Sequence, residues 1–238
     1  MKKVLNDLFD NDNLKIFQAI DGFKFSLDSI LLAEYVKITS KTKNILDLCT
    51  GNASIPLILS TKTNAIIDAF EIQTNIYDLA IQSVTYNKLD NIINVYNASI
   101  KDIDNYVKGK KYDIITCNPP YFKVLENSNI NLTRELALAR HEISVTLEDI
   151  FNISSRYLND GGELYLVHRV SRLDEIIINA NNYNLNVKDI ELINTKENSK
   201  PYIVLVRCIK NSKLGIKINN PKYINELKTY KDLFKEDL

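Results

Sequence analysis

The residues with the most specific chemistry in this 238-residue chain are Asn118-Pro119-Pro120-Tyr121, which follow the apolar run Tyr112–Cys117. Proline restricts φ, lacks an amide donor and pushes the preceding residue out of the helical region. Two consecutive prolines therefore make a stiff turn that holds the Asn118 side chain and nearby carbonyl oxygens in one geometry. Tyr121 adds a flat aromatic face beside these acceptors. We predict that this turn binds a flat substrate with an exocyclic NH2 group.

Two further groups follow predicted strands at positions where ligands are bound. The segment 47–54, which contains Gly51, follows one apolar strand, and Glu71 ends the next. In open α/β sheets, ligands lie at the carboxyl ends of the strands. A glycine lets the backbone approach a ligand, and a strand-end carboxylate can accept both hydroxyls of a ribose. Each signal alone also fits a structural turn or a solvated acid, but together with Asn118 they predict a nucleotide site on one edge.

The expected nucleotide carries a ribose but no phosphate chain. The loop after the first strand lacks the Gly-Lys-Ser/Thr sequence that holds a triphosphate and magnesium. No pair of arginines follows it to bind a pyrophosphate. S-adenosylmethionine has a ribose and no phosphate, so it is the predicted cofactor.

Alternating strand-like and helix-like patterns position these groups. The order predicts an α/β fold of the Rossmann-like kind, with a mostly parallel sheet, helices on both faces and a terminal antiparallel hairpin. Thr74 is expected to cap one helix. Ser26 and Asp28 are candidates to cap another helix or to contact the cofactor, and capping is favoured. Strands are expected over 44–48, 65–71, 92–96, 112–117, 163–168, 186–193 and 202–209, and helices from 55, over 74–88, from 146 and over 171–183.

Composition limits the remaining classes of function. The 30 basic and 30 acidic residues balance, so a nucleic-acid partner needs a local basic patch rather than an overall positive field. Cys49, Cys117 and Cys208 lack metal-like spacing, which predicts reduced, mostly buried thiols in a cytoplasmic protein. Neither a signal peptide nor a membrane span is expected.

These residues resemble a class I methyltransferase, with its Asp-x-x-x-Gly loop, the acidic end of the second strand and the Asn-Pro-Pro-Tyr turn. More closely, the chain resembles the bacterial tRNA(Val) (adenine-37-N6)-methyltransferase family, and the resemblance runs nearly end to end. The blocks that carry it are residues 23–33, 45–48, 71–73, 116–122, 139–142, 146–149 and 166–169.

The resemblance implies methyl transfer from S-adenosylmethionine to the N6 amine of an adenine in tRNA, adenine 37 of tRNA(Val). It implies the tRNA anticodon loop as partner, no metal and no membrane, and a monomer is favoured. The catalytic residues are then Asn118, Pro119, Pro120 and Tyr121. The cofactor contacts are Asp47, Cys49, Gly51, Glu71, Ile72, Ser99, Ile100 and Asn118. The substrate contacts are Tyr121, Phe122, Arg140 and His141, with His168 and Arg169 as further candidates.

The chain departs from the family pattern at two places. The family loop usually reads Asp-x-Gly-x-Gly-x-Gly, and here Cys49 and Ala53 replace the outer glycines. The family also places an aspartate after the third strand to meet the adenine amine of the cofactor. Ser99 stands there in this chain, with Asp102 three residues on. A hydroxyl accepts such a hydrogen bond less strongly than a carboxylate.

The domain organisation expected from these blocks has three parts. Residues 1–40 form an N-terminal extension that packs on the core, 41–210 the methyltransferase domain, and 211–238 a C-terminal tail. Other functions stay open at this point. Protein glutamine-N5 methylation, rRNA guanine-N2 methylation and a non-catalytic RNA-binding module that retains the fold are all compatible with the motifs.

Overall fold

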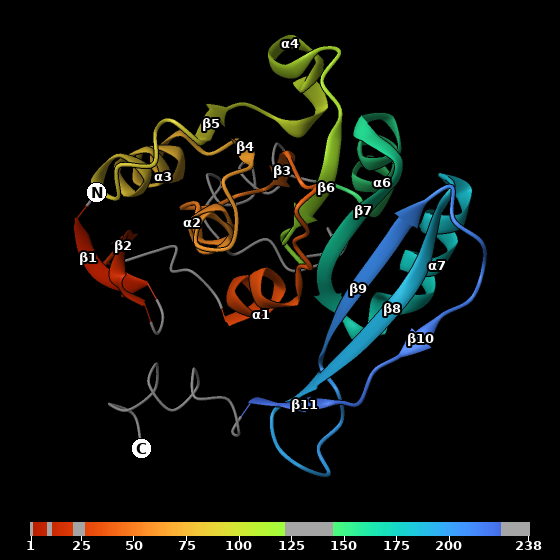
Figure 1. Cartoon of the computed structure of the whole chain (residues 1–238). Coiled ribbons are helices and arrows are strands. Elements are labelled where there is room, and N and C mark those ends of the chain that lie inside the picture. The colour runs from red at the N-terminus through yellow and green to blue at the C-terminus, as the bar shows by residue number, and fades with distance from the viewer. Residues whose placement is uncertain (1, 9–10, 21–26, 122–144, 225–238) are drawn as a thin grey trace, which may run out of the picture.

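The computed structural model describes residues 2–8, 11–20, 27–121 and 145–224. Within these residues, a mixed sheet of nine strands forms the centre of the molecule, with helices on both faces (Figure 1). Its strands are β3 (Asn44–Leu48), β4 (Ile66–Glu71), β5 (Ile93–Asn97), β6 (Tyr112–Cys117), β7 (Leu158–Arg169), β8 (Leu185–Asn194), β9 (Ile203–Lys210), β10 (Lys217–Ile218) and β11 (Lys222–Tyr223).

The strand order is β10-β8-β9-β7-β6-β3-β4-β5, with β11 also pairing with β8. Strands β5, β4, β3, β6 and β7 are parallel to one another. Strand β9 runs antiparallel to both β7 and β8. The predicted parallel sheet with a terminal antiparallel hairpin is therefore confirmed. Because parallel strands point the same way, the carboxyl ends of the first five lie on one edge.

Helices cover both faces of the sheet, and each face has its own apolar layer (Figure 1). Ile45 packs with α1, α2 and α3 on one face, while its neighbour Leu46 packs with α6 and α7 on the other. Burial on both faces explains why such strands read as continuous apolar runs. The helices are α1 (Leu27–Tyr35), α2 (Ser54–Ser60), α3 (Thr74–Tyr86), α4 (Asp104–Val107), α6 (Leu147–Tyr157) and α7 (Leu173–Asn182), and the short 3-10 turns are η1 (Ile100–Asp102) and η2 (Val170–Arg172).

An antiparallel hairpin, β1 (Lys3–Leu8) with β2 (Asn11–Ala19), precedes the sheet and was not expected from the sequence. It lies on α3, where the Phe17 amide donates to Ser83 Oγ at 2.9 Å. The division into residues 1–40, 41–210 and 211–238 stays a prediction, and 225–238 lie outside the described residues.

The helix boundaries follow local hydrogen bonds. The helix expected from residue 146 is α6, and Thr146 caps it: its hydroxyl accepts from the Asp149 amide, while the Asp149 carboxylate accepts from the Thr146 amide. The cap predicted at Thr74 is wrong, because the capping position of α3 is Gln73. The chain turns at Gln73, whose amide donates to the Glu71 carboxylate. Thr74 Oγ1 instead donates to Asn97 Oδ1 at 2.9 Å.

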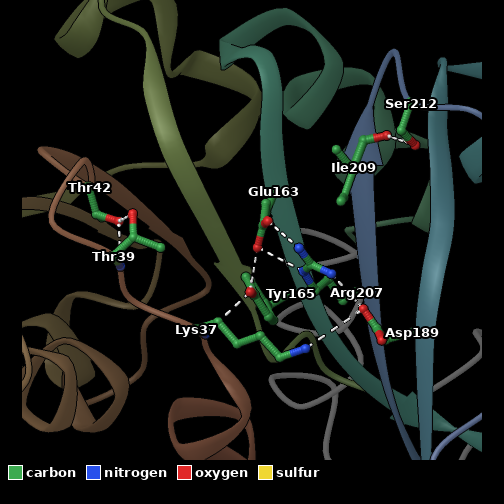
Figure 2. Close-up of polar contacts among 9 residues, drawn as sticks. All are labelled: Lys37, Thr39, Thr42, Glu163, Tyr165, Asp189, Arg207, Ile209 and Ser212. Atoms are coloured by element: carbon green, nitrogen blue, oxygen red, sulfur yellow. Dashed lines mark hydrogen bonds and ion pairs between the residues drawn. The ribbon is translucent and has the colours of Figure 1, made fainter. Parts of the chain in front are cut away.

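A mostly buried polar network joins α1 to the antiparallel part of the sheet (Figure 2). The guanidinium of Arg207 on β9 donates to both oxygens of Glu163 on β7, and to Asp189 Oδ2 on β8 at 2.6 Å. Glu163 also accepts from the Tyr165 hydroxyl, which in turn accepts from the Lys37 amide just beyond α1. Arg207 therefore neutralises carboxylates from the two strands that flank β9, and the network helps to hold α1 in place.

Candidate active site

The predicted functional residues meet at the carboxyl edge of the parallel strands. Strand β3 pairs with β4 on one side and β6 on the other, so that Leu48 is level with both Phe70 and Cys117. The chain then continues from β3 into the 49–53 loop, from β4 into Glu71, and from β6 into Asn118. The sheet thus brings together the three groups that the sequence analysis singled out.

The loop after β3 has the backbone of a glycine-rich loop with only one glycine. Cys49, Gly51 and Ala53 have φ values of 59°, 61° and 68°, all in the left-handed region that favours glycine. Hydrogen bonds from two backbone amides hold this path: the Thr50 amide donates to the Phe70 carbonyl at 2.9 Å, and the Gly51 amide donates to the side-chain oxygen Glu71 Oε2 at 3.0 Å. Cys49 and Ala53 therefore adopt a backbone conformation that glycine would adopt without strain.

Two buried carboxylates flank this loop. Asp47 Oδ1 accepts from the Thr116 hydroxyl at 2.5 Å, whereas the buried Oδ2 accepts no hydrogen bond from the residues that the structure describes. Burial raises the pKa of Asp47 to about 7, against the opposing effect of the Thr116 hydrogen bond. Burial also raises the pKa of Glu71, although the amides of Gln73 and Gly51 donate to its carboxylate and favour the charged form.

The end of β5 places the next predicted cofactor contacts. Asn97 Nδ2 donates to the Glu71 carbonyl at 3.0 Å and ties this strand end to β4. Ser99 caps η1, and its hydroxyl oxygen accepts from the Lys101 amide at 3.2 Å. Ile100 is buried, while Ile72, which follows β4, is exposed.

The Asn-Pro-Pro-Tyr turn is held by the first helix. Asn118 Nδ2 donates to Ser29 Oγ at 2.9 Å, and Asn118 Oδ1 accepts from the Tyr121 hydroxyl at 2.9 Å. The same hydroxyl also lies 2.8 Å from Asp28 Oδ2, and its single proton is donated to only one of these two oxygens at a time. The cap predicted at Asp28 is wrong, because α1 begins at Leu27 and Asp28 lies in its first turn, from which it contacts the catalytic turn. Pro119 is buried and Pro120 is exposed.

Tyr121 lies among groups from the end of β7. Its ring is 5.2 Å from the His168 ring, and the Arg169 guanidinium carbon is 5.2 Å from the Tyr121 centroid. Burial lowers the pKa of His168 to about 4, so this imidazole is neutral at pH 7. Burial also raises the pKa of Asp28, opposed by the hydrogen bond from Tyr121 and the charge of Arg169.

The structure brings the cofactor and catalytic candidates to one edge, but it does not describe every predicted substrate contact. Phe122, Arg140 and His141 lie outside the described residues, as does Ser26. Sequence reasoning missed Ser29 as a contact of the catalytic turn. The one indication of this contact in the sequence is that Ser29 lies within residues 23–33, a block that carries the family resemblance although it precedes the turn by about ninety residues.

Within the part of the chain that the structure describes, no cluster of three or more His, Cys, Asp or Glu side chains has an arrangement that would hold a metal ion. None of the described helices combines the length and the apolar character that crossing a bilayer requires. All three cysteines are free thiols.

Comparison with known proteins adds two kinds of finding, of which the first concerns sequence. The family model for the methyltransferase small domain matches residues 24–189. A relative from Cytophaga hutchinsonii named tRNA1(Val) (adenine(37)-N6)-methyltransferase is 28% identical over 183 residues, which cover 77% of this chain and 75% of the relative. A relative of the same name from Parabacteroides distasonis is 26% identical, covering 93% of this chain and 94% of its own length.

The second finding concerns solved structures. A predicted O-methyltransferase from Agrobacterium tumefaciens superposes with a TM-score of 0.66 at 19% identity, covering 86% of this chain and 90% of that one. TrmK from M. capricolum, solved with S-adenosyl-homocysteine, superposes with a TM-score of 0.54 at 14% identity, covering 84% and 74%. At these identities the likeness concerns the fold, which is that of class I methyltransferases.

Proposed function

This chain belongs to the methyltransferase small domain family, and from that membership we propose that it transfers a methyl group from S-adenosylmethionine to the N6 amine of an adenine in tRNA. One observation carries the proposal. The Asn118 turn after β6 lies beside the loop after β3, so an amine acceptor site adjoins a nucleoside site. The names of the curated relatives favour adenine 37 of tRNA(Val) as the target.

The residues at this edge fit S-adenosylmethionine. The left-handed backbone at Cys49, Gly51 and Ala53 gives the open loop that a ligand can approach closely. Asp47 Oδ2 is a buried acceptor that accepts no hydrogen bond within the described residues, which suits a positively charged ligand. Glu71 holds the loop and is the acceptor for the ribose hydroxyls, and the Ser99 hydroxyl, beside Ile100, is the acceptor for the adenine amine.

The cofactor supplies a methyl group on a positively charged sulfur, so the protein mainly has to orient and polarise the amine. Asn118 Oδ1 and the Pro119 carbonyl accept from the target NH2 and draw it toward a tetrahedral shape. The nitrogen lone pair then points at the methyl group. An amide oxygen has two lone pairs, so Asn118 Oδ1 can accept from the substrate amine while it also lies 2.9 Å from the Tyr121 hydroxyl. Orientation and polarisation by preorganised dipoles are large catalytic effects.

The neighbouring residues keep this geometry. Ser29 holds the Asn118 amide, and Asp28 holds the Tyr121 hydroxyl from the same helix. The Tyr121 ring is the stacking face for the target base, which contributes about 1–3 kcal/mol. Removing a base from a stack costs a few kcal/mol and less in a loop. A single-stranded anticodon loop therefore suits this site better than a duplex.

The proposal is tested by the product. The purified protein is incubated with labelled S-adenosylmethionine and transcribed tRNA(Val), the RNA is digested to nucleosides, and these are identified by mass spectrometry. We expect N6-methyladenosine, and its loss when adenine 37 is replaced by guanine. If the label appeared in N2-methylguanosine, the methyl acceptor would be a guanine. If it were transferred only to protein, the acceptor would be a glutamine side chain. The tRNA partner, a monomeric state and a cytoplasmic location are parts of the same proposal.

Cofactor binding is expected to weaken as the pH falls through 7. The pKa of Asp47 is about 7 in the cofactor-free protein because burial disfavours the charge. A cationic ligand favours the ionised carboxylate, so its binding releases a proton, and its affinity falls by roughly tenfold for each pH unit below that pKa. Calorimetric titration at pH 6, 7 and 8 measures the cofactor affinity, and its repetition in two buffers with different ionisation enthalpies measures the proton released on binding.

The matched control is Asp47→Asn, which removes the titration and should give weaker cofactor binding with little dependence on pH.

The stability of the cofactor-free protein depends on pH in the opposite direction from cofactor binding, since it decreases as the pH rises. The contribution of Asp47 to folding is present below its ordinary pKa of 3.8 and is lost as the pH rises through about 7. Equal affinities for the parent protein at pH 6 and pH 8 would contradict the assigned role of Asp47.

A further inference from the structure

An exposed tyrosine lies on the same edge of the sheet as the catalytic turn. Tyr202 precedes β9 and is level with the end of β7, where its carbonyl accepts from the Val170 amide at 3.1 Å. Its own amide donates to the Ile193 carbonyl, also at 3.1 Å. Both backbone groups are thus fixed by neighbouring strands, while 54% of the residue remains exposed. The backbone is rigid and the ring faces solvent.

Arg169 connects this ring to the catalytic turn. Its guanidinium carbon is 3.7 Å from the Tyr202 centroid and 5.2 Å from the Tyr121 centroid. The three side chains form a continuous series that runs from the proposed adenine site outward to solvent. Arg169 lies against one face of Tyr202, so the exposed surface of the ring is on the other face. A planar cation behind an aromatic ring also lowers the cost of bringing a polyanion close.

The turn before Tyr202 adds positive charge on a rigid support. The Ser199 hydroxyl accepts from the Lys196 amide and donates to the Lys196 carbonyl, and Asn194 Nδ2 donates to the Ser199 carbonyl. Lys196 and Lys200 are both exposed on this turn, which also carries the exposed acid Glu197. Two lysines and an exposed aromatic ring within seven residues are the elements of a single-stranded nucleic-acid site, in which bases stack and phosphates pair with cations.

We infer that Tyr202, backed by Arg169, is a stacking platform for a nucleobase that neighbours the target adenine in a single-stranded RNA loop, with Lys200 beside the adjoining phosphate. The inference rests on the proposed function and adds to it a second base contact outside the catalytic turn. The platform receives a flanking base when the target base leaves the stack. It therefore contributes to RNA affinity and not to the polarisation of the amine.

The test compares the KM for RNA with kcat, using a tRNA(Val) anticodon stem–loop as substrate. Tyr202→Ala should raise the KM for RNA by roughly five- to 150-fold, the value of one base stack. It should change neither kcat at saturating RNA nor the Kd of S-adenosylmethionine. Tyr202→Phe keeps the ring and should recover most of the affinity. The matched control is Tyr86→Ala, which removes a similarly exposed tyrosine (52%) from α3 and should leave the KM for RNA unchanged.

A spectroscopic probe locates the contact directly. Stem–loops with 2-aminopurine on the 5′ or the 3′ side of the target adenine should change fluorescence on binding to the parent protein, and one of these changes should disappear with Tyr202→Ala. Lys200→Ala should lower the slope of log KM against log salt by about 0.7, the value for one phosphate contact on a single strand.

The outcomes separate the two proposals. An active parent protein with an unchanged KM for RNA in Tyr202→Ala would overturn the platform alone. A loss confined to kcat would also overturn it, because Tyr202 would then act by positioning Arg169 against Tyr121. A parent protein that methylates no RNA would overturn the proposed function and the platform with it.

Discussion

Asn118→Ala is expected to lower kcat by at least about a hundredfold, as the loss of other preorganised catalytic dipoles does. The substitution removes the oxygen that accepts from the target amine but leaves Asp47, Gly51 and Glu71 in place. The Kd of S-adenosylmethionine should therefore stay close to that of the parent protein. Single-turnover methylation of the anticodon stem–loop measures the chemical step, and calorimetry measures cofactor binding.

The comparison variant for this experiment is Ser29→Ala. It keeps the Asn118 oxygen and removes only the hydroxyl that accepts from Asn118 Nδ2 at 2.9 Å. The loss of one neutral hydrogen bond is worth about 0.5–1.5 kcal/mol, so the rate should fall between about two- and tenfold. If Asn118→Ala turned over within a few-fold of the parent protein, Asn118 would be a structural residue of the turn and not a catalytic one.

Arg207→Ala is expected to destabilise the fold by about 3 kcal/mol, because it leaves the mostly buried Glu163 without its cation and Asp189 with only the Lys37 ammonium group, 3.9 Å away. The side chains of Arg207, Glu163 and Asp189 are only 17%, 21% and 9% exposed. The like charges on the two strands that flank β9 then repel each other in a poorly solvated site. Urea unfolding followed by circular dichroism gives the free energy of unfolding for both proteins.

Two further variants show whether the uncompensated charges are the cause. Arg156→Ala breaks an ion pair with Asp104 in which both side chains are about half exposed, and it should leave the unfolding midpoint near that of the parent protein. Adding Glu163→Gln and Asp189→Asn to Arg207→Ala should restore much of the lost stability. If Arg207→Ala unfolded at the parent midpoint, the network of Figure 2 would contribute little to folding.

The central strands could be predicted from the sequence because their apolar runs have one physical cause. Strands β3 and β6 were expected at 44–48 and 112–117 and have those bounds in the structure. Both strands are buried on two faces, so most of their residues are apolar and the strands can be recognised in the sequence. The hairpin of β1 and β2 was missed because its strands are mostly polar, and its place depends on contacts with α3. Strand β7 starts at Leu158, five residues before the prediction, through its pairing with Tyr112.

The candidate site was predictable in part, for a related reason. Strand-end positions follow from the order of elements, so Asp47, Glu71 and Asn118 could be placed on one edge of the sheet from the sequence alone. The support of Asn118 by Ser29 and of Tyr121 by Asp28 spans 89 and 93 residues of chain. No local pattern encodes a side-chain contact across that separation. The same holds for Tyr202, which reads as an ordinary strand residue until β9 is paired with β7.

The loop after β3 has a consequence for how such proteins are found. Cys49 and Ala53 adopt torsions that cost an L-residue about 1–2 kcal/mol each, and the hydrogen bonds around Gly51 keep the path in spite of that cost. A motif search that counts glycines would score this loop as decayed. A search on backbone torsions would score it as intact, because Cys49, Gly51 and Ala53 all have the left-handed backbone of a glycine-rich loop.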